Sequence, residues 1–120
     1  METLCEVELN GLPPTVNHLY RTGRSGHRYK TAMGKLYQDY VSVILRQRWN
    51  GRPKYTGNVE VRIEFITKSH RRWDIDNRVK ALQDCLNIGG ILKDDSQVQV
   101  LHVERVYGQK ERTRLKIIGL

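Results

Sequence analysis

Two short acidic stretches contain the residue types that could do chemistry in this chain. The first holds Asp74 and Asp76, and the second is the pair Asp94-Asp95. Carboxylates that lie close together repel one another unless a cation sits between them, and magnesium prefers oxygen ligands while keeping several waters. A phosphodiester under hydrolysis needs the same ion, which neutralises the phosphate, helps to ionise water and stabilises the leaving oxygen. The acids therefore favour metal-dependent cleavage of a nucleic acid.

A helix predicted from about Asp76 to Asn87 must position the first stretch. Its apolar residues recur at helical spacing and should face a sheet; they are Ile75, Val79, Leu82 and Leu86. A polar stripe lies on another face; it contains Asp76, Asn77, Lys80 and Asp84. Gly89-Gly90 ends the helix. The chain that returns from this turn carries Asp94-Asp95, which can supply a third carboxylate.

Each acidic residue also has a purely structural interpretation. Asp76 could cap the helix, with its carboxylate on backbone N–H groups near the positive end of the helix dipole. Asp76 could instead form an ordinary i, i+4 ion pair with Lys80, which could also pair with Asp84. Asp94-Asp95 could simply form a turn. Spacing alone leaves these alternatives open.

The hydrophobic pattern predicts a single α/β (α+β) domain over residues 1–120, in the order strand, helix, strand, helix, strand, strand. Strands are expected at about 3–9, 58–67, 98–106 and 115–118, because apolar and polar residues alternate there. The first long helix should begin after a cap at Thr31 and end near Trp49. Residues 108–111 are expected to form a hairpin turn. Two helices would then pack on a small mixed sheet.

The formal net charge of +8 indicates an affinity for polyanions, of which nucleic acid is the obvious candidate. Basic side chains gather in a glycine-rich loop at 20–30, with a short strand expected near 27–29, and in a turn at 68–72. These are the best candidates for contacts to phosphates: Arg21, Arg24, Arg28, Lys30, Lys68, Arg71 and Arg72.

Other classes of protein fit the sequence less well. No apolar run approaches the roughly 20 residues of a membrane helix, and the N-terminus lacks the basic-then-apolar layout of a secretory signal. We therefore expect a cytoplasmic protein. Cys5 and Cys85 are too few for a disulfide framework and are interpreted as small buried hydrophobic residues.

Three segments of the chain resemble the RusA family of Holliday junction resolvases. The stretch Asp74-Ile75-Asp76-Asn77-Arg78-Val79-Lys80 is followed by Asp84 and then by Lys93-Asp94-Asp95-Ser96-Gln97-Val98. The segment Gly11-Leu12-Pro13-Pro14-Thr15-Val16-Asn17-His18-Leu19-Tyr20-Arg21 also looks like that family's Pro-Pro and Asn loop. The resemblance covers nearly the whole chain and is most specific over residues 72–98. Trp73 departs from the pattern, and could pack in the core or stack on a base.

The resemblance implies a homodimeric endonuclease, bacterial or encoded by a phage or prophage, that binds four-way DNA junctions. It would resolve them by paired symmetric nicks in recombination and repair. Magnesium would be the cofactor, manganese could replace it, and 5′-phosphate and 3′-hydroxyl ends would result. The implied catalytic residues are Asp74, Asp76, Asp95 and Lys80, with metal bound by Asp74, Asp76 and Asp95. Asp84 and Asp94 would be supporting acids, and Asn17 would join the basic side chains as a DNA contact.

Three rival functions fit parts of the same sequence. A non-catalytic basic nucleic-acid-binding module explains the charge but gives the clustered acids no purpose. A nuclease directed at RNA would differ in its substrate, and a basic scaffold protein would tolerate replacement of its aspartates. Magnesium-dependent cleavage of a four-way junction separates the predicted resolvase from all three.

Overall fold

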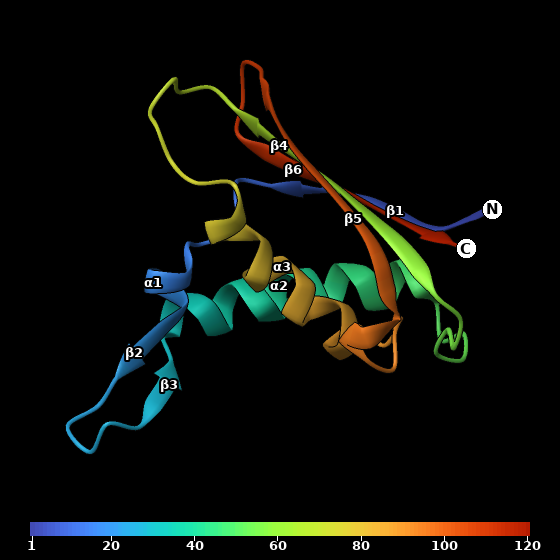
Figure 1. Ribbon diagram of the computed structural model, residues 1–120, viewed down its shortest axis with the longest axis horizontal. Helices are drawn as coiled ribbons and strands as arrows, with labels where there is room; N and C mark the ends of the chain where they lie inside the picture. The colour runs from blue at the N-terminus through green and yellow to red at the C-terminus, as the bar shows by residue number, and fades with distance from the viewer.

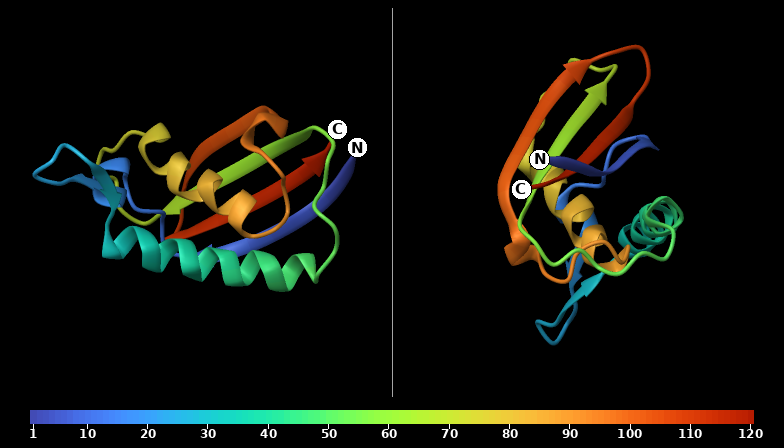
Figure 2. Two further views of the ribbon diagram at one scale, coloured as in Figure 1. Left: turned by 90° about the horizontal axis from the view of Figure 1, so that it is seen from below. Right: turned by 90° about the vertical axis from the view of Figure 1, so that its right-hand side faces the viewer.

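One four-stranded sheet forms the body of the protein, and two long helices cover one of its faces (Figures 1 and 2). The computed structural model describes residues 1–120, apart from the side chain of Leu19. In chain order the elements are β1 (Glu2–Asn10), α1 (Val16–Leu19), β2 (Tyr20–Thr22), β3 (Arg28–Lys30), α2 (Ala32–Trp49), β4 (Val59–Thr67), α3 (Asp76–Ile88), the 3-10 turn η1 (Asp95–Gln97), β5 (Val98–Tyr107) and β6 (Arg112–Gly119). The predicted fold class and order of major elements are confirmed, and α1, β2 and η1 are short additions to that prediction.

The strands lie in the order β1-β6-β4-β5, with β4 and β5 parallel and the other neighbours antiparallel. The connection from β4 through α3 to β5 is therefore a βαβ unit, since parallel neighbours need a long crossover. The predicted hairpin turn at residues 108–111 is wrong, because β4 lies between β5 and β6. The crossover places β5 on one side of β4, so the connection at residues 108–111 passes over the end of β4 to reach β6 on its other side.

Alternating residues of the central strands build the core. Val61, Ile63 and Phe65 of β4 are fully buried, and the apolar stripe of α3 packs against the helix-covered side of the sheet. Val79, Leu82 and Leu86 of that stripe are buried, as predicted, and Ile75 is partly buried. Truncating a buried leucine to alanine costs about 2–5 kcal/mol. This packing fixes the rotation of α3, so the polar stripe faces outward.

The predicted cap of α2 is confirmed. The Thr31 hydroxyl accepts a hydrogen bond from the Gly34 N–H at 3.0 Å, and the helix ends where Asn50 adopts a left-handed conformation, with φ of 55°. The end of α3 at Gly89 and Gly90 also agrees with the prediction, and Gly90 has a φ of 81°. Along the described backbone, no helix is both long and apolar enough to cross a membrane.

The glycine-rich basic segment folds into a small hairpin that projects from one end of the molecule (Figure 1). β2 pairs antiparallel with β3, and the register places Tyr20 opposite Lys30 and Thr22 opposite Arg28. The expected strand near 27–29 is therefore present at Arg28–Lys30, and it has a partner that the sequence did not indicate.

Candidate functional site

A groove separates the N-terminal end of α3 from β5. Three of the predicted site residues, Asp74, Asp76 and Lys80, line it together. The remaining lining residues are Trp73, Ile75, Val79, Gln83, Leu101, Val103 and Arg105. Two carboxylates and one ammonium group thus face a surface that is otherwise largely apolar.

The carboxylates of Asp74 and Asp76 are exposed, and neither forms a hydrogen bond or ion pair with any described residue. Asp76 lies in the first turn of α3 but does not cap it, because Ile75 occupies the cap position and no side chain accepts a bond there. Asp76 also does not pair with Lys80. Both structural interpretations of Asp76 are therefore wrong. Two free carboxylates beside the positive end of a helix dipole suit the binding of a cation together with an anionic ligand.

Lys80 instead pairs with Asp84, one turn further along α3. The Lys80 Nζ lies 3.4 Å from Asp84 Oδ1, and the hydroxyl of Tyr20 donates to Asp84 Oδ2 at 3.1 Å. Partial burial and the Asp84 carboxylate raise the pKa of Tyr20 above its usual value. An exposed pair of this kind contributes at most about 0.5 kcal/mol to stability. Its consequence is geometric: Asp84 orients Lys80 and joins α3 to the basic hairpin.

Asp94 and Asp95 lie at the other end of α3. Asp95 Oδ1 accepts a hydrogen bond from Asn87 Nδ2 at 3.0 Å. Since Asn87 follows Asp76 by eleven residues, about 16 Å of helix axis separates Asp95 from Asp76. The expected approach of these two aspartates is therefore not observed within one chain. Among the described residues no three His, Cys, Asp or Glu side chains form a group that could hold a metal ion.

Asp94 has the turn-forming role that its sequence position allowed. Its carboxylate accepts bonds from the Ser96 N–H and hydroxyl and caps η1, while the Gln97 side chain completes a capping box. The bonds from Ser96 hold the pKa of Asp94 below its usual value. The two neighbouring aspartates thus differ: Asp94 is engaged by its own turn, and Asp95 is exposed with a single amide partner.

The predicted DNA contacts lie on two segments that flank the N-terminal end of α3 (Figures 1 and 2). One is the β2–β3 hairpin with α1, and the other is the loop between β4 and α3. The exposed members are Asn17, Arg21, Arg24, Arg28, Lys68, Arg71 and Arg72. Lys30 is half-buried and donates to the Gln38 side chain, and Arg28 stacks on the Tyr20 ring at 4.4 Å.

Sequence reasoning missed the two arginines that contact Trp73, the loop residue immediately before Asp74. Two guanidinium groups lie over the Trp73 ring, that of Arg105 at 4.0 Å from its centroid and that of Arg78 at 4.8 Å. Arg105 donates to the Trp73 carbonyl, and Trp73 meets Phe65 edge-on at 5.8 Å. Trp73 therefore packs against the core. Arg105 follows Leu101 and Val103 at alternate positions of β5, a pattern that could have placed it on the groove side.

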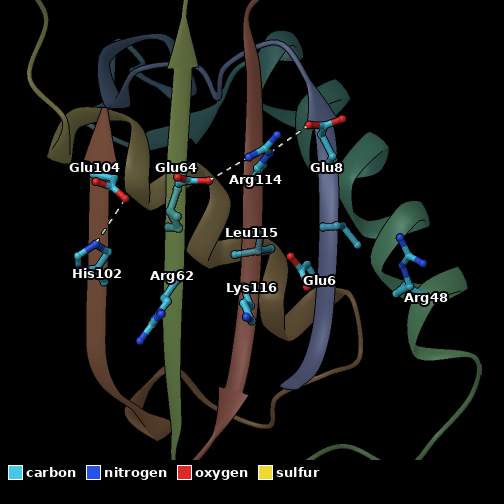
Figure 3. A pocket seen from close by; sticks show the side chains of 12 residues that line it. Glu6, Glu8, Arg48, Arg62, Glu64, His102, Glu104, Arg114, Leu115 and Lys116 are labelled. Carbon is cyan, nitrogen blue, oxygen red and sulfur yellow. Dashed lines mark hydrogen bonds and ion pairs between the residues drawn. The ribbon is translucent and has the colours of Figure 1, made fainter. Parts of the chain in front are cut away.

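A second hollow lies on the helix-free face of the sheet (Figure 3). Two of its acids have basic partners on the neighbouring strand β6: Glu8 contacts Arg112 and Arg114 at 3.1 and 3.3 Å, and Arg114 also contacts Glu64 at 3.6 Å. The carboxylates of Glu8 and Glu64 are therefore ion-paired, unlike those of the groove. The groove is therefore the better candidate site.

The cysteines are buried and free, as expected. Burial raises the pKa of Cys85 to about 12, and its thiol donates to the Ala81 carbonyl. Because the thiolate is the reactive form, Cys85 is not available as a nucleophile near neutral pH.

Comparison with known proteins gives one consistent result. The family model described as "Endodeoxyribonuclease RusA" matches residues 11–118. The crossover junction endodeoxyribonuclease RusA of Escherichia coli K12 is 36% identical over 86 residues, covering 72% of this chain and 70% of that protein. The protein of the same name from Enterobacteria phage 82 is 37% identical over 89 residues, with the same coverage. The one from Aquifex aeolicus is 26% identical over 113 residues, covering 93% of this chain and 89% of its own.

Proposed function

The chain belongs to the RusA family of endodeoxyribonucleases, and on that basis we propose that it resolves four-way DNA junctions by paired symmetric nicks, in recombination and repair. The observation that carries this proposal is the groove, in which Asp74 and Asp76 have free carboxylates beside Lys80. Positively charged segments flank the same end of α3, so a DNA backbone could reach it. A cytoplasmic location, in a bacterium or after expression from a phage or prophage, belongs to the same proposal.

Magnesium, which manganese can replace, is the proposed cofactor. The donors fit, because magnesium is commonly bound by one or two carboxylates together with phosphate oxygens and waters. Asp74 and Asp76 would hold it from one chain. When bound, the ion supplies a positive charge for the scissile phosphate and lowers the pKa of a water.

The remaining chemistry is assigned to the chain's own residues. In the proposed hydrolysis a water oxygen bonds to phosphorus and the bond to the 3′ oxygen breaks, with a proton passing to that oxygen. The products are a 5′-phosphate and a 3′-hydroxyl. Lys80, oriented by Asp84, would bind a non-bridging phosphate oxygen as negative charge grows on it. Apolar walls, including Val103 and Leu101, would limit competing water.

A homodimer would place Asp95 in this site. β5 is an edge strand of ten residues that pairs only with β4 among the described strands, and it exposes Val100 by 43% and Leu101 by 45%. Long, exposed, apolar edges pair readily with another strand. The opposite edge, β1, is protected by a bulge between Thr3 and Cys5 and by acidic side chains. A second copy is therefore proposed to pair at β5.

The direction of that pairing determines which residues meet. Two β5 strands related by a two-fold axis near Val100 and Leu101 run antiparallel, so the start of one lies beside the end of the other. The start of β5 follows Asp95, and its end lies near Arg105, which contacts Trp73 next to Asp74. Asp95 of each copy would then approach Asp74 and Asp76 of the other. Each dimer would have two complete sites, as paired nicks require.

The first experiment tests cleavage itself. A mobile synthetic four-way junction is incubated with the protein in magnesium and, separately, with chelator, and the nicks are mapped on all four strands. We expect symmetric pairs of nicks that religate, and no cleavage with chelator. Duplex, flap and RNA substrates serve as controls. Preferential cutting of RNA would contradict the junction assignment, and binding without cleavage would favour a non-catalytic nucleic-acid-binding module.

A further inference from the structure

We infer that His70 and Tyr107 form a stacking platform for an unpaired nucleobase at the crossover of a bound four-way junction. The inference rests on the proposed junction function and adds a base-binding site to it. The two rings are stacked, with centroids 4.4 Å apart and planes inclined by 21°. They come from different parts of the chain, His70 from the loop after β4 and Tyr107 from the last position of β5.

Backbone bonds around the two rings hold the platform in place. The Gly108 N–H donates to the Thr67 carbonyl at 2.9 Å, which ties the end of β5 to the start of the loop. Within the loop, the Thr67 hydroxyl donates to the Ser69 carbonyl at 3.2 Å, and the Arg71 N–H donates to the Ser69 hydroxyl at 3.0 Å. The stack is therefore part of the folded structure, and ordering it would cost little on binding.

The platform remains accessible despite its internal stacking. Tyr107 is 51% exposed and His70 is also exposed. Trp73, by contrast, is half-buried and its ring is already contacted by the guanidinium groups of Arg78 and Arg105. The stacked pair thus offers more exposed aromatic surface than Trp73 does.

The surrounding charge identifies the occupant. Lys68, Arg71 and Arg72 flank His70 in the same loop, which has no acidic residue between Lys68 and Arg72. Aromatic rings interleaved with cations suit single-stranded nucleic acid, in which a base stacks while the neighbouring phosphates contact the basic side chains. A protein partner without a strong negative charge would interact less favourably with these three cations than a nucleic acid would. The occupant is therefore a nucleobase.

Position relative to the groove restricts which base it is. Tyr107 follows Arg105 by two residues of strand, about 7 Å, and Arg105 contacts the residue before Asp74. Bases inside a duplex stack on both neighbours and present no free face. When a bound four-way junction is opened, the base pairs at the crossover lack a stacking neighbour on one side, so a base there can leave its pair and stack on the platform while the adjacent phosphate lies in the groove.

The experiment uses the full chain carrying Asp76→Asn, so that cleavage does not consume the substrate. Junctions contain 2-aminopurine either at the crossover or within an arm, and affinity and fluorescence are measured with Tyr107→Ala, Tyr107→Phe or the exposed control Leu36→Ala added. We expect Tyr107→Ala to weaken junction binding about 5- to 100-fold and to change only the crossover signal. Duplex affinity should be unchanged. Tyr107→Phe and Leu36→Ala should behave as the Asp76→Asn parent.

The outcomes separate the platform from the function on which it rests. Unchanged junction affinity and crossover fluorescence in Tyr107→Ala would overturn the platform and leave the resolvase proposal standing. An equal loss of duplex and junction binding would also overturn it, since it would indicate a general contact. If the Asp76→Asn parent shows no preference for junctions over duplex, the junction function fails, and the platform fails with it.

Discussion

The two ends of α3 each present a pair of aspartates, but their surroundings differ. At the N-terminal end Asp74 and Asp76 face a groove without protein partners, and basic segments flank them. At the C-terminal end Asp94 caps a 3-10 turn and Asp95 bonds to Asn87. Two aspartate pairs that look equivalent in the sequence thus differ in whether their carboxylate oxygens already accept hydrogen bonds from the protein. Carboxylates left free near a helix N-terminus are the ones available to an external cation.

Asp95 falls between these two cases, because it has a protein partner but is not fully engaged by it. It has one amide partner and stays exposed, so its carboxylate remains accessible to a second chain. Its own chain places it about 16 Å along α3 from Asp76. A second copy paired at β5 would remove that separation. The two ends of one helix would then serve a single site through two chains.

The largest loss of cleavage should follow from changing Asp76, one of the two aspartates with free carboxylates. Asp76→Asn removes a charge with little change of volume, and we expect single-turnover cleavage of a junction to fall about 1,000-fold. Junction affinity in the absence of cleavage should be retained, because Asp76 forms no hydrogen bond or ion pair with any described residue. Cleavage by Asp76→Asn at the unmodified protein's rate in magnesium would show that Asp76 is not a site residue.

A smaller loss of cleavage rate is expected when Lys80 is changed. Lys80→Ala should reduce the cleavage rate at saturating enzyme about 100-fold, since one charged donor to the phosphate is lost, and should weaken binding much less. The matched control is Lys93→Ala, an exposed lysine at the other end of α3, for which rates should be unchanged. Equal losses in the two variants would mean that Lys80 acts only through general charge.

The smallest effect on cleavage is expected at Asp94. Asp94→Ala should lower the melting temperature at neutral pH, because the η1 cap is lost, and should keep the cleavage rate within about 3-fold of the unmodified rate. The folded pKa of Asp94 is depressed, so its stabilisation is present above about pH 4 and is lost as the pH falls below that value. The difference in melting temperature should therefore vanish in acid. A difference that persists there would assign the effect to something other than the charged cap.

Local features of the sequence predicted the parts of this protein that depend on local physics. The helical spacing of Val79, Leu82 and Leu86 predicted which face of α3 is buried, and with it the outward face that carries Lys80. The cap at Thr31 was predicted from residue type alone. These features succeed because periodicity and capping involve residues only a few positions apart.

Features that depend on tertiary arrangement were not predicted. Nothing near residues 108–111 reveals that β4 separates β5 from β6, and the His70–Tyr107 stack joins residues 37 positions apart. The position of Asp95 also depends on tertiary arrangement. The rise of about 1.5 Å per helical residue places Asn87 about 16 Å from Asp76, but the residues from Asn87 to Asp95 could span that distance if extended. The folded turn, in which Asp95 bonds to Asn87, keeps it at the far end of α3.

The most direct test of the shared site combines two inactive variants. Asp76→Asn and Asp95→Asn chains carrying different tags are co-expressed, and the mixed dimer is purified through both tags and assayed on a four-way junction in magnesium. If Asp95 serves the groove of the other copy, one site in the mixed dimer has all its aspartates. We predict single nicks from the mixed dimer and none from either variant alone. A mixed dimer as inactive as its parents would contradict the account and would place Asp95 in the site of its own chain.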